Sequence, residues 1–290
     1  MNWIKVFVME FALGSAGWRS KYGFFGENLL GVEQIEIISA EAYLKGFDWI
    51  DTAPTYGDAE DFIGKAQVQQ KIATKVTVNI NDLNSILQSI ESSLLKLNLR
   101  SIDLLFVHNW DLFDRDRKNT IVSKLESFKE IGLISQWGVC TYESDEILKI
   151  TETNWTNFSI QINTNILDQR ILKVSKMFKT QELDARGIEL WARSIFLQGV
   201  LVDFSSSNRF INHPDVIKFM NFANQNKISP MILCLLYVKQ IKLIDVVVVG
   251  IKNFNQLNQF ALAKNEKDKN FELSQLASSD ISLIDPRVWA

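Results

Sequence analysis

Cysteine is scarce in this chain of 290 residues, which contains only Cys140 and Cys234. The two residues lie far apart and match no metal-ligand spacing, so we expect neither a disulfide framework nor a bound metal. Chains without disulfides are typical of reducing compartments. The sequence therefore predicts a cytoplasmic protein.

An excess of charge of one sign is also missing, because 31 Lys and Arg residues face 34 Asp and Glu residues. No basic stripe is present, which argues against nucleic acid as a partner. The apolar run at residues 1–13 carries Lys5 and Glu10 and has no cleavage site, unlike a signal peptide. The longest apolar run, residues 231–238, is too short to span a bilayer, so we expect no membrane partner.

Glycine and proline are sparse, at 13 and 4 residues, and no segment has the composition of a linker. Hydrophobic residues make up 47% of the chain, which is enough for a large core. We therefore expect residues 1–290 to form one domain.

Apolar strand patterns alternate with helical patterns along the chain. Eight core strands are expected at residues 10–13, 47–50, 71–76, 103–107, 134–140, 158–162, 188–192 and 246–249. Helical segments are expected at residues 33–45, 59–63, 83–97, 121–131, 144–150, 169–185, 216–226, 230–239 and 255–263.

This alternation implies parallel strands, and eight units suit a closed (β/α)8 TIM barrel of the α/β class. Residues 3–8 are expected to form an N-terminal β-hairpin with residues 10–13. An open doubly wound sheet is the alternative, but no G-x-G-x-x-G follows the first strand.

Residues 46–64, GFDWIDTAPTYGDAEDFIG, read as strand, loop and helix, with Asp51 ending the strand and Tyr56 in the loop. Parallel α/β folds place their chemistry at such strand ends. An Asp before a turn can also serve only to satisfy local backbone donors.

Other expected strands end in polar or reactive groups too, and in a barrel all of them face one pocket. Besides Asp51 and Tyr56, these groups are Lys75, His108, Cys140, Thr141, Gln161, Arg193, Ser194, Gly250 and Lys252.

The chemistry that this set suggests is proton donation to a carbonyl oxygen. A Tyr with its ordinary pKa of about 10 is a weak acid, and a nearby cation lowers that pKa. Lys75 can supply the cation, Asp51 can pair with Lys75, and His108 can orient the carbonyl. Protein side chains carry no hydride, so a nicotinamide cofactor is required.

Several of these residues have a structural alternative. The Asp51–Lys75 pair can be purely structural, and His108 can simply cap its strand. Trp18 and Trp110 either line the substrate pocket or pack its rim. Lys75 without its carboxylate would instead suit a Schiff-base isomerase or aldolase.

The motifs resemble those of the aldo-keto reductase family across nearly the whole chain. Besides residues 46–64, the matching segments are KIATKV, SIESSLLKLNLRSIDLLFVHNW, GLISQWGVCTY, SIQINTNILDQR and VVVVGIKNFNQL. The resemblance implies that Tyr56 is the general acid, that Lys75 and Asp51 tune it, and that His108 orients the carbonyl. It also implies NADPH, less often NADH, bound across the barrel mouth.

By the same resemblance, Gln161 contacts the cofactor's carboxamide and Ser194 its pyrophosphate region. The other implied cofactor contacts are Gly14, Ser15, Asp51, Arg193, Gly250, Lys252 and Gln256.

The chain departs from the family pattern at several cofactor positions. Cys140 and Thr141 replace a common Ser-Asn pair, and Arg193 replaces an aromatic residue. Gln256 and Phe260 replace an Arg and an Asn, which leaves Lys252 as the main cation for a 2′-phosphate.

The resemblance implies an NAD(P)H-dependent oxidoreductase that reduces a small aldehyde or ketone to an alcohol. The segments WARSIFLQGVL and LIDPRVW look most like members found among surface-polysaccharide genes, which suggests a sugar-derived substrate. The alternative is a non-catalytic nucleotide-binding module with a protein partner.

Overall fold

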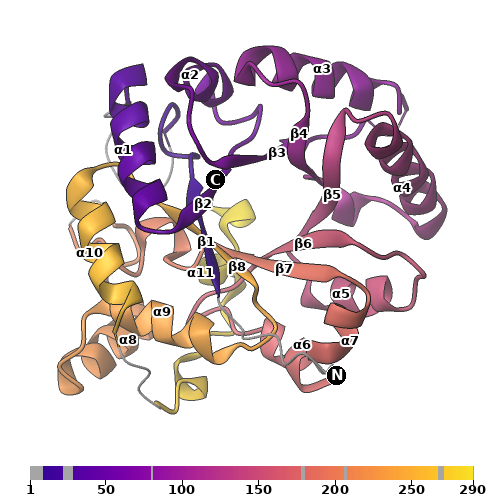
Figure 1. The fold of residues 1–290 in the computed structure, drawn as a ribbon. Coiled ribbons are helices and arrows are strands. Elements are labelled where there is room, and N and C mark those ends of the chain that lie inside the picture. The colour runs from indigo at the N-terminus through magenta and orange to yellow at the C-terminus, as the bar shows by residue number, and fades with distance from the viewer. Residues whose placement is uncertain are drawn as a thin grey trace, which may run out of the picture.

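The fold is a closed barrel of strands surrounded by helices (Figure 1). It is seen in a computed structural model, which describes residues 9–21, 29–79, 81–177, 180–205, 208–266 and 271–289. The expected strand at residues 3–8, and with it the N-terminal hairpin, lies outside these residues.

Eight strands form the barrel, and each pairs in parallel with its neighbours in chain order. They are β1 (Glu10–Gly14), β2 (Phe47–Asp51), β3 (Lys71–Val76), β4 (Ile102–Val107), β5 (Ile134–Thr141), β6 (Phe158–Asn163), β7 (Ile188–Arg193) and β8 (Val246–Gly250). The barrel closes where β1 pairs with both β2 and β8. The predicted (β/α)8 barrel is confirmed, and the open sheet is excluded.

Helices follow the strands and form the outer layer (Figure 1). They are α1 (Val32–Leu44), α2 (Ala59–Ala66), α3 (Ser85–Leu97), α4 (Arg115–Glu130), α5 (Ser144–Thr151), α6 (Ile171–Met177), α7 (Thr180–Ala185), α8 (Pro214–Gln225), α9 (Pro230–Gln240) and α10 (Phe254–Lys264). Shorter elements are η1 (Trp110–Leu112), η2 (Leu197–Gly199), η3 (Ser274–Leu276), α11 (Ile281–Ile284) and η4 (Pro286–Val288).

Helix α4 begins six positions earlier than the sequence pattern predicts, at Arg115 instead of residue 121. Its first turns are polar and show no apolar spacing, which hides them from a periodicity argument. The start is set by Asp114, whose carboxylate accepts a hydrogen bond of 2.9 Å from the backbone nitrogen of Arg117. Such an N-cap satisfies one of the free donors of the first turn.

Side chains alternate along each strand between the barrel interior and the helix layer. On β1, Phe11 and Leu13 pack toward the helices, whereas Ala12 belongs to the interior cluster. The interior is filled by large rings, with the Trp49 and Trp191 centroids 5.1 Å apart and the Phe106 and Trp191 centroids 5.5 Å apart. Because the interior is packed, a ligand can bind only at an end of the barrel.

Two residues of the segment after β2 have structural roles that hold α2 in place. The buried Glu60 accepts a hydrogen bond of 2.6 Å from the Thr74 hydroxyl on β3. A Cβ at Gly64 would lie 2.2 Å from the carbonyl oxygen of Lys96, so only glycine allows α2 to approach α3 this closely. These contacts fix the loop that carries Tyr56.

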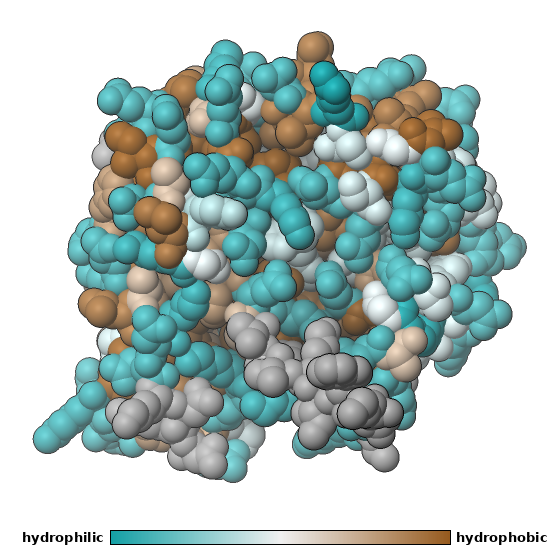
Figure 2. Space-filling view, in the orientation of Figure 1, coloured by the Kyte–Doolittle hydropathy of each residue, from teal (hydrophilic) through white to brown (hydrophobic). Residues whose placement is uncertain are grey.

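Hydrophilic side chains cover most of the face seen in Figure 2, with smaller hydrophobic groups between them. Exposed apolar residues such as Leu44, Leu95 and Leu262 belong to three different helices, α1, α3 and α10. Within the described ranges, no helix is both long and apolar enough to cross a membrane.

Candidate active site

A buried ion pair lies at the carboxyl ends of β2 and β3. The Lys75 ammonium donates to both carboxylate oxygens of Asp51, at 2.8 and 2.7 Å, and to the carbonyl oxygen of Thr52 at 2.8 Å. Lys75 is 2% exposed and Asp51 is 4% exposed. The three donor positions of the ammonium are therefore satisfied, and the pair raises the pKa of Lys75 above its ordinary value.

Gln161 on β6 extends this pair into a short hydrogen-bonded chain. Its amide nitrogen donates to Asp51 Oδ1 at 2.7 Å, and its amide oxygen accepts from the thiol of Cys140, with a sulfur–oxygen distance of 3.6 Å. Burial raises the pKa of Cys140 to about 11, which keeps the thiol protonated as a donor. Gln161 is fully buried and points at Asp51, and its contact with the cofactor carboxamide stays a prediction.

Tyr56 lies over Lys75, with the ammonium nitrogen 5.0 Å from the centroid of the phenol ring. Burial raises the pKa of Tyr56, and the charges of Lys75 and Arg193 offset only part of that effect. The expected effect of the cation is present, since Lys75 lowers this pKa, but burial has the larger effect. The desolvation of the phenolate is larger than its attraction to the cations.

His108 follows β4, and its backbone nitrogen donates to the carbonyl oxygen of Val76 at 2.8 Å. Burial, together with the charges of Lys75 and Arg193, lowers the pKa of the imidazole to about 4. The ring is therefore neutral at physiological pH and carries one N–H donor.

A pocket opens beside Tyr56 at the carboxyl ends of β1, β7 and β8. Tyr56 lines it together with seven of the predicted cofactor residues, namely Gly14, Asp51, Arg193, Ser194, Gly250, Lys252 and Gln256. Ser15 is fully buried instead, and its hydroxyl has no hydrogen-bond partner among the described residues. The sequence thus identified half of the residues that line the pocket.

The wall after β7 contains three residues other than glycine in the left-handed backbone region. The φ angles are 62° at Ser194, 48° at Leu197 and 52° at Gln198. Such conformations cost free energy and cluster at functional sites. Leu197 holds the turn by donating its backbone N–H to the Ser194 carbonyl oxygen at 2.8 Å.

Lys252 lies at the end of the pocket beyond β8, where its side chain passes over Gly17. A Cβ at position 17 would lie 2.4 Å from Lys252 Cε, so glycine leaves the space for this lysine. Gln256 holds the lysine backbone by accepting its N–H at 2.8 Å. Within the described part of the chain the ammonium has no ion-pair partner, so it is free to bind a phosphate. The donors of this pocket therefore fit a nicotinamide dinucleotide.

Trp18 and Trp110 are not among the residues that line this pocket, and their predicted substrate role stays a prediction. Each side chain is fully buried. The Trp18 indole donates to the carbonyl oxygen of Ile251 at 2.7 Å, and the Trp110 indole donates to Glu146 at 3.1 Å. Both rings pack as core side chains, which fits the rim-packing alternative that the sequence left open.

Tyr142 was missed by the sequence analysis, although it directly follows Thr141 at the end of β5. Its hydroxyl accepts a hydrogen bond of 3.2 Å from Arg193 Nη1, and the Arg193 guanidinium lies over its ring. Its position two residues beyond the expected strand at 134–140 was the available signal. In the described part of the chain, no group of three or more His, Cys, Asp or Glu residues has the arrangement of a metal site.

Comparison with known proteins gives a likeness in both sequence and fold. A stretch of 126 residues is 29% identical to the methylglyoxal reductase DkgA of Yersinia pestis, and covers 42% of this chain and 45% of that protein. The match thus spans less than half the length of that relative.

Two solved structures share the fold at low sequence identity. An aldo-keto reductase of Bacillus halodurans in its holo form has a TM-score of 0.72 at 19% identity, covering 93% of this chain and 92% of that one. A Bombyx mori aldo-keto reductase in complex with NADP has a TM-score of 0.64 at 18% identity, covering 92% and 88%.

The family model described as "Aldo/keto reductase family" matches residues 12–280. That range contains all eight strands except the first two residues of β1, and it includes the buried ion pair and the pocket. The chain therefore belongs to the aldo/keto reductase family.

Proposed function

We propose that this protein reduces an aldehyde or ketone to an alcohol, with NADPH as the hydride donor and Tyr56 as the general acid. The observation that carries the proposal is the position of Tyr56, which lies over the Lys75–Asp51 pair and lines the same pocket as Lys252. The family match supports the reaction class.

NADPH, when bound, supplies the hydride that the side chains lack. Lys252 would hold its 2′-phosphate, and Ser194, Gly14 and Gly250 would line the rest of its path. Arg193 would lie near the ring that carries the hydride.

Tyr56 holds the proton that the reduced carbonyl oxygen needs. Its raised pKa keeps the hydroxyl protonated at neutral pH. An alkoxide is a much stronger base than a phenolate, so the transfer remains favourable. The charge of Lys75 stabilises the phenolate that forms, and Asp51 keeps Lys75 protonated.

His108 donates its neutral N–H to the carbonyl oxygen and orients it toward Tyr56.

Within this proposal the substrate is sugar-derived, on the resemblance of residues 191–201 and 283–289. The methylglyoxal reductase relative adds small dicarbonyls to the compounds worth testing.

A fluorescence titration of the purified protein with NADPH and with NADH tests the cofactor assignment. The eight tryptophans provide the signal. We expect NADPH to bind roughly 10- to 100-fold more tightly than NADH, because one charge-assisted contact contributes about 1.5–3 kcal/mol. In Lys252→Met that ratio should fall toward one.

Turnover is then measured as NADPH consumption with methylglyoxal and simple sugar aldehydes. Binding of NADPH without turnover on any carbonyl would instead support a non-catalytic module with a protein partner. Binding of neither nucleotide would contradict both proposals.

The pH profile of kcat/KM for reduction should be flat from about pH 5 to about pH 9. His108, with a pKa of about 4, is already neutral across this range. Burial raises the pKa of Tyr56, so its proton is lost only above the ordinary value of about 10. Stopped assays in overlapping buffers measure the profile, and an inflection near pH 6.5 would contradict the assignment of His108.

A further inference from the structure

Arg193 brings a buried positive charge to the pocket without a counter-ion. Its guanidinium lines the pocket beside Tyr56, and Nη1 donates to the Tyr142 hydroxyl at 3.2 Å. Nε and Nη2 are buried and have no hydrogen-bond acceptor among the described residues. No carboxylate of the described ranges forms an ion pair with Arg193. Leaving a buried charge and two donors unpaired is costly, unless a ligand completes the site.

In three other arginines of this chain, Nε and Nη2, which form one edge of the guanidinium, bind a carboxylate with two hydrogen bonds. Nε and Nη2 of Arg19 contact the two carboxylate oxygens of Asp58 at 2.7 and 3.0 Å. The corresponding distances from Arg170 to Asp168 are 2.8 and 2.7 Å. Arg287 binds Asp285 through this edge as well. The unpaired edge of Arg193 thus has the geometry for a carboxylate.

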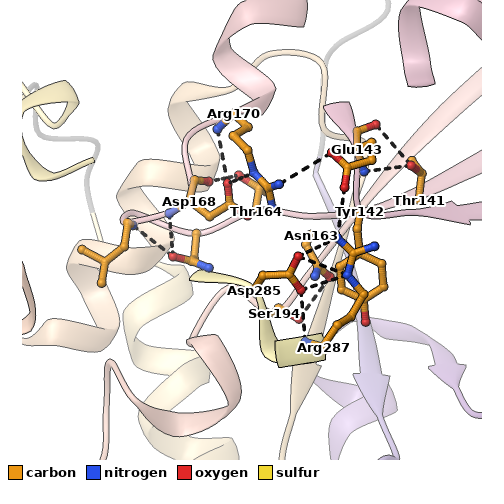
Figure 3. A network of polar contacts seen from close by, with 12 residues as sticks. Thr141, Tyr142, Glu143, Asn163, Thr164, Asp168, Arg170, Ser194, Asp285 and Arg287 are labelled. Atoms are coloured by element: carbon orange, nitrogen blue, oxygen red, sulfur yellow. Dashed lines mark hydrogen bonds and ion pairs between the residues drawn. The ribbon is translucent and has the colours of Figure 1, made fainter. Parts of the chain in front are cut away.

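Tyr142 holds the Arg193 guanidinium in place. The guanidinium carbons of Arg193 and Arg287 lie 4.3 and 4.1 Å from the centroid of its ring. Asp285 and Glu143 neutralise Arg287, as Figure 3 shows. The backbone nitrogen of Tyr142 donates to Asp111 at 2.9 Å. The donors of Arg193 are therefore preorganised. Of the two arginines that lie against the Tyr142 ring, Arg287 is paired with carboxylates and Arg193 has none among the described residues.

The charge of Arg193 acts at the end of the pocket where the carbonyl reacts. Arg193 and Tyr56, the proposed general acid, line the same pocket, and the charge of Arg193 also acts on the His108 imidazole. Lys252, the cation assigned to the phosphate, projects from the loop beyond β8. An anion at Arg193 is therefore placed near the reacting carbonyl.

We propose that the substrate is a carbonyl compound that carries a carboxylate a few atoms from the carbonyl carbon, and that Arg193 binds this carboxylate through Nε and Nη2. This inference rests on the proposed function and names its substrate class. Arg193 then acts as a specificity residue for the reduction.

The test compares acids with their neutral methyl esters, which keep the same aldehyde. The pairs are 4-oxobutanoate with methyl 4-oxobutanoate, and 4-carboxybenzaldehyde with methyl 4-formylbenzoate, each with saturating NADPH. We expect wild-type kcat/KM to favour the acid by roughly 10- to 100-fold in at least one pair, from hydrogen bonds to a charged group. Any effect of a substitution on cofactor binding cancels in the acid-to-ester ratio.

Three variants locate the preference. Arg193→Gln should bring the acid-to-ester ratio of kcat/KM close to one. Arg193→Lys should give an intermediate ratio, because lysine keeps the charge but lacks the two parallel N–H donors of the guanidinium. Arg287→Gln is the matched control, since it removes the other guanidinium over Tyr142 and should change the ratio far less. A ratio that falls equally in Arg287→Gln would assign the effect to the stack as a whole and overturn the inference.

Equal reduction of acid and ester by the wild-type protein would overturn the inference and leave carbonyl reduction intact. Absence of turnover on every aldehyde would contradict the proposed function itself. In that case a fluorescence titration with succinate and with succinamide decides the inference separately. Tighter binding of succinate that is lost in Arg193→Gln would support a carboxylate site, and equal binding would exclude it.

Discussion

Replacement of Tyr56 by Phe is expected to lower kcat for carbonyl reduction by roughly 100- to 10,000-fold, the usual contribution of a positioned general acid. The phenol is the acid assigned to the carbonyl oxygen, and Lys75 beneath it already gives its hydrogen bonds to Asp51 and Thr52. Loss of the hydroxyl alone should leave the Kd for NADPH of the same order.

Steady-state kinetics with the best aldehyde, together with a fluorescence titration, measures both quantities. Tyr43→Phe is the matched control, because Tyr43 lies on the outer helix α1 and is 41% exposed. Retained turnover in Tyr56→Phe would remove Tyr56 from the mechanism, even if NADPH still binds.

Replacement of Lys75 by Met is expected to lower the free energy of unfolding by about 3–5 kcal/mol, because it leaves Asp51 as a buried charge without its partner. Asp51→Asn should cost a similar amount, since it leaves the Lys75 ammonium buried. The double variant should lose less than the sum of the two, because neither charge remains unpaired. Urea denaturation followed by tryptophan fluorescence measures all three.

The Lys65–Asp61 pair on α2 is the matched control, as its two side chains are 58% and 41% exposed. Lys65→Met should cost about 0.5 kcal/mol or less, as is usual for an exposed pair. Activity separates the two readings of the buried pair. A stable double variant that still turns over would make the pair structural, whereas a stable but inactive one supports its role under Tyr56.

Strand and helix positions followed from local patterns, but contacts between distant segments did not. The nearly continuous apolar run at 103–107 identifies β4, because a buried parallel strand needs little more than such a run. The start of α4 was missed because polar residues carry no apolar period. The Tyr142–Arg287 contact joins residues far apart in the chain, and no local pattern encodes it.

Among the site residues too, positions followed from local patterns, whereas properties that depend on distant packing did not. Asp51, Lys75 and His108 stand at strand ends, so the barrel geometry brings them together without further information. The direction of the Tyr56 pKa shift depends on how fully the phenol is desolvated, which is a property of the packed structure. Trp18 and Trp110 show the same limit, because a tryptophan beside a pocket and one beneath its rim have the same sequence pattern.

The pairing of β1 with β8 also determines when the barrel can close during synthesis. The first strand is made early, at Glu10–Gly14, and its partner Val246–Gly250 is made among the last elements. Until then the nascent sheet has two open edges, and unpaired edges of this kind promote aggregation. Recombinant yield should therefore depend on protecting the growing chain, and products that stop before residue 246 should accumulate in inclusion bodies.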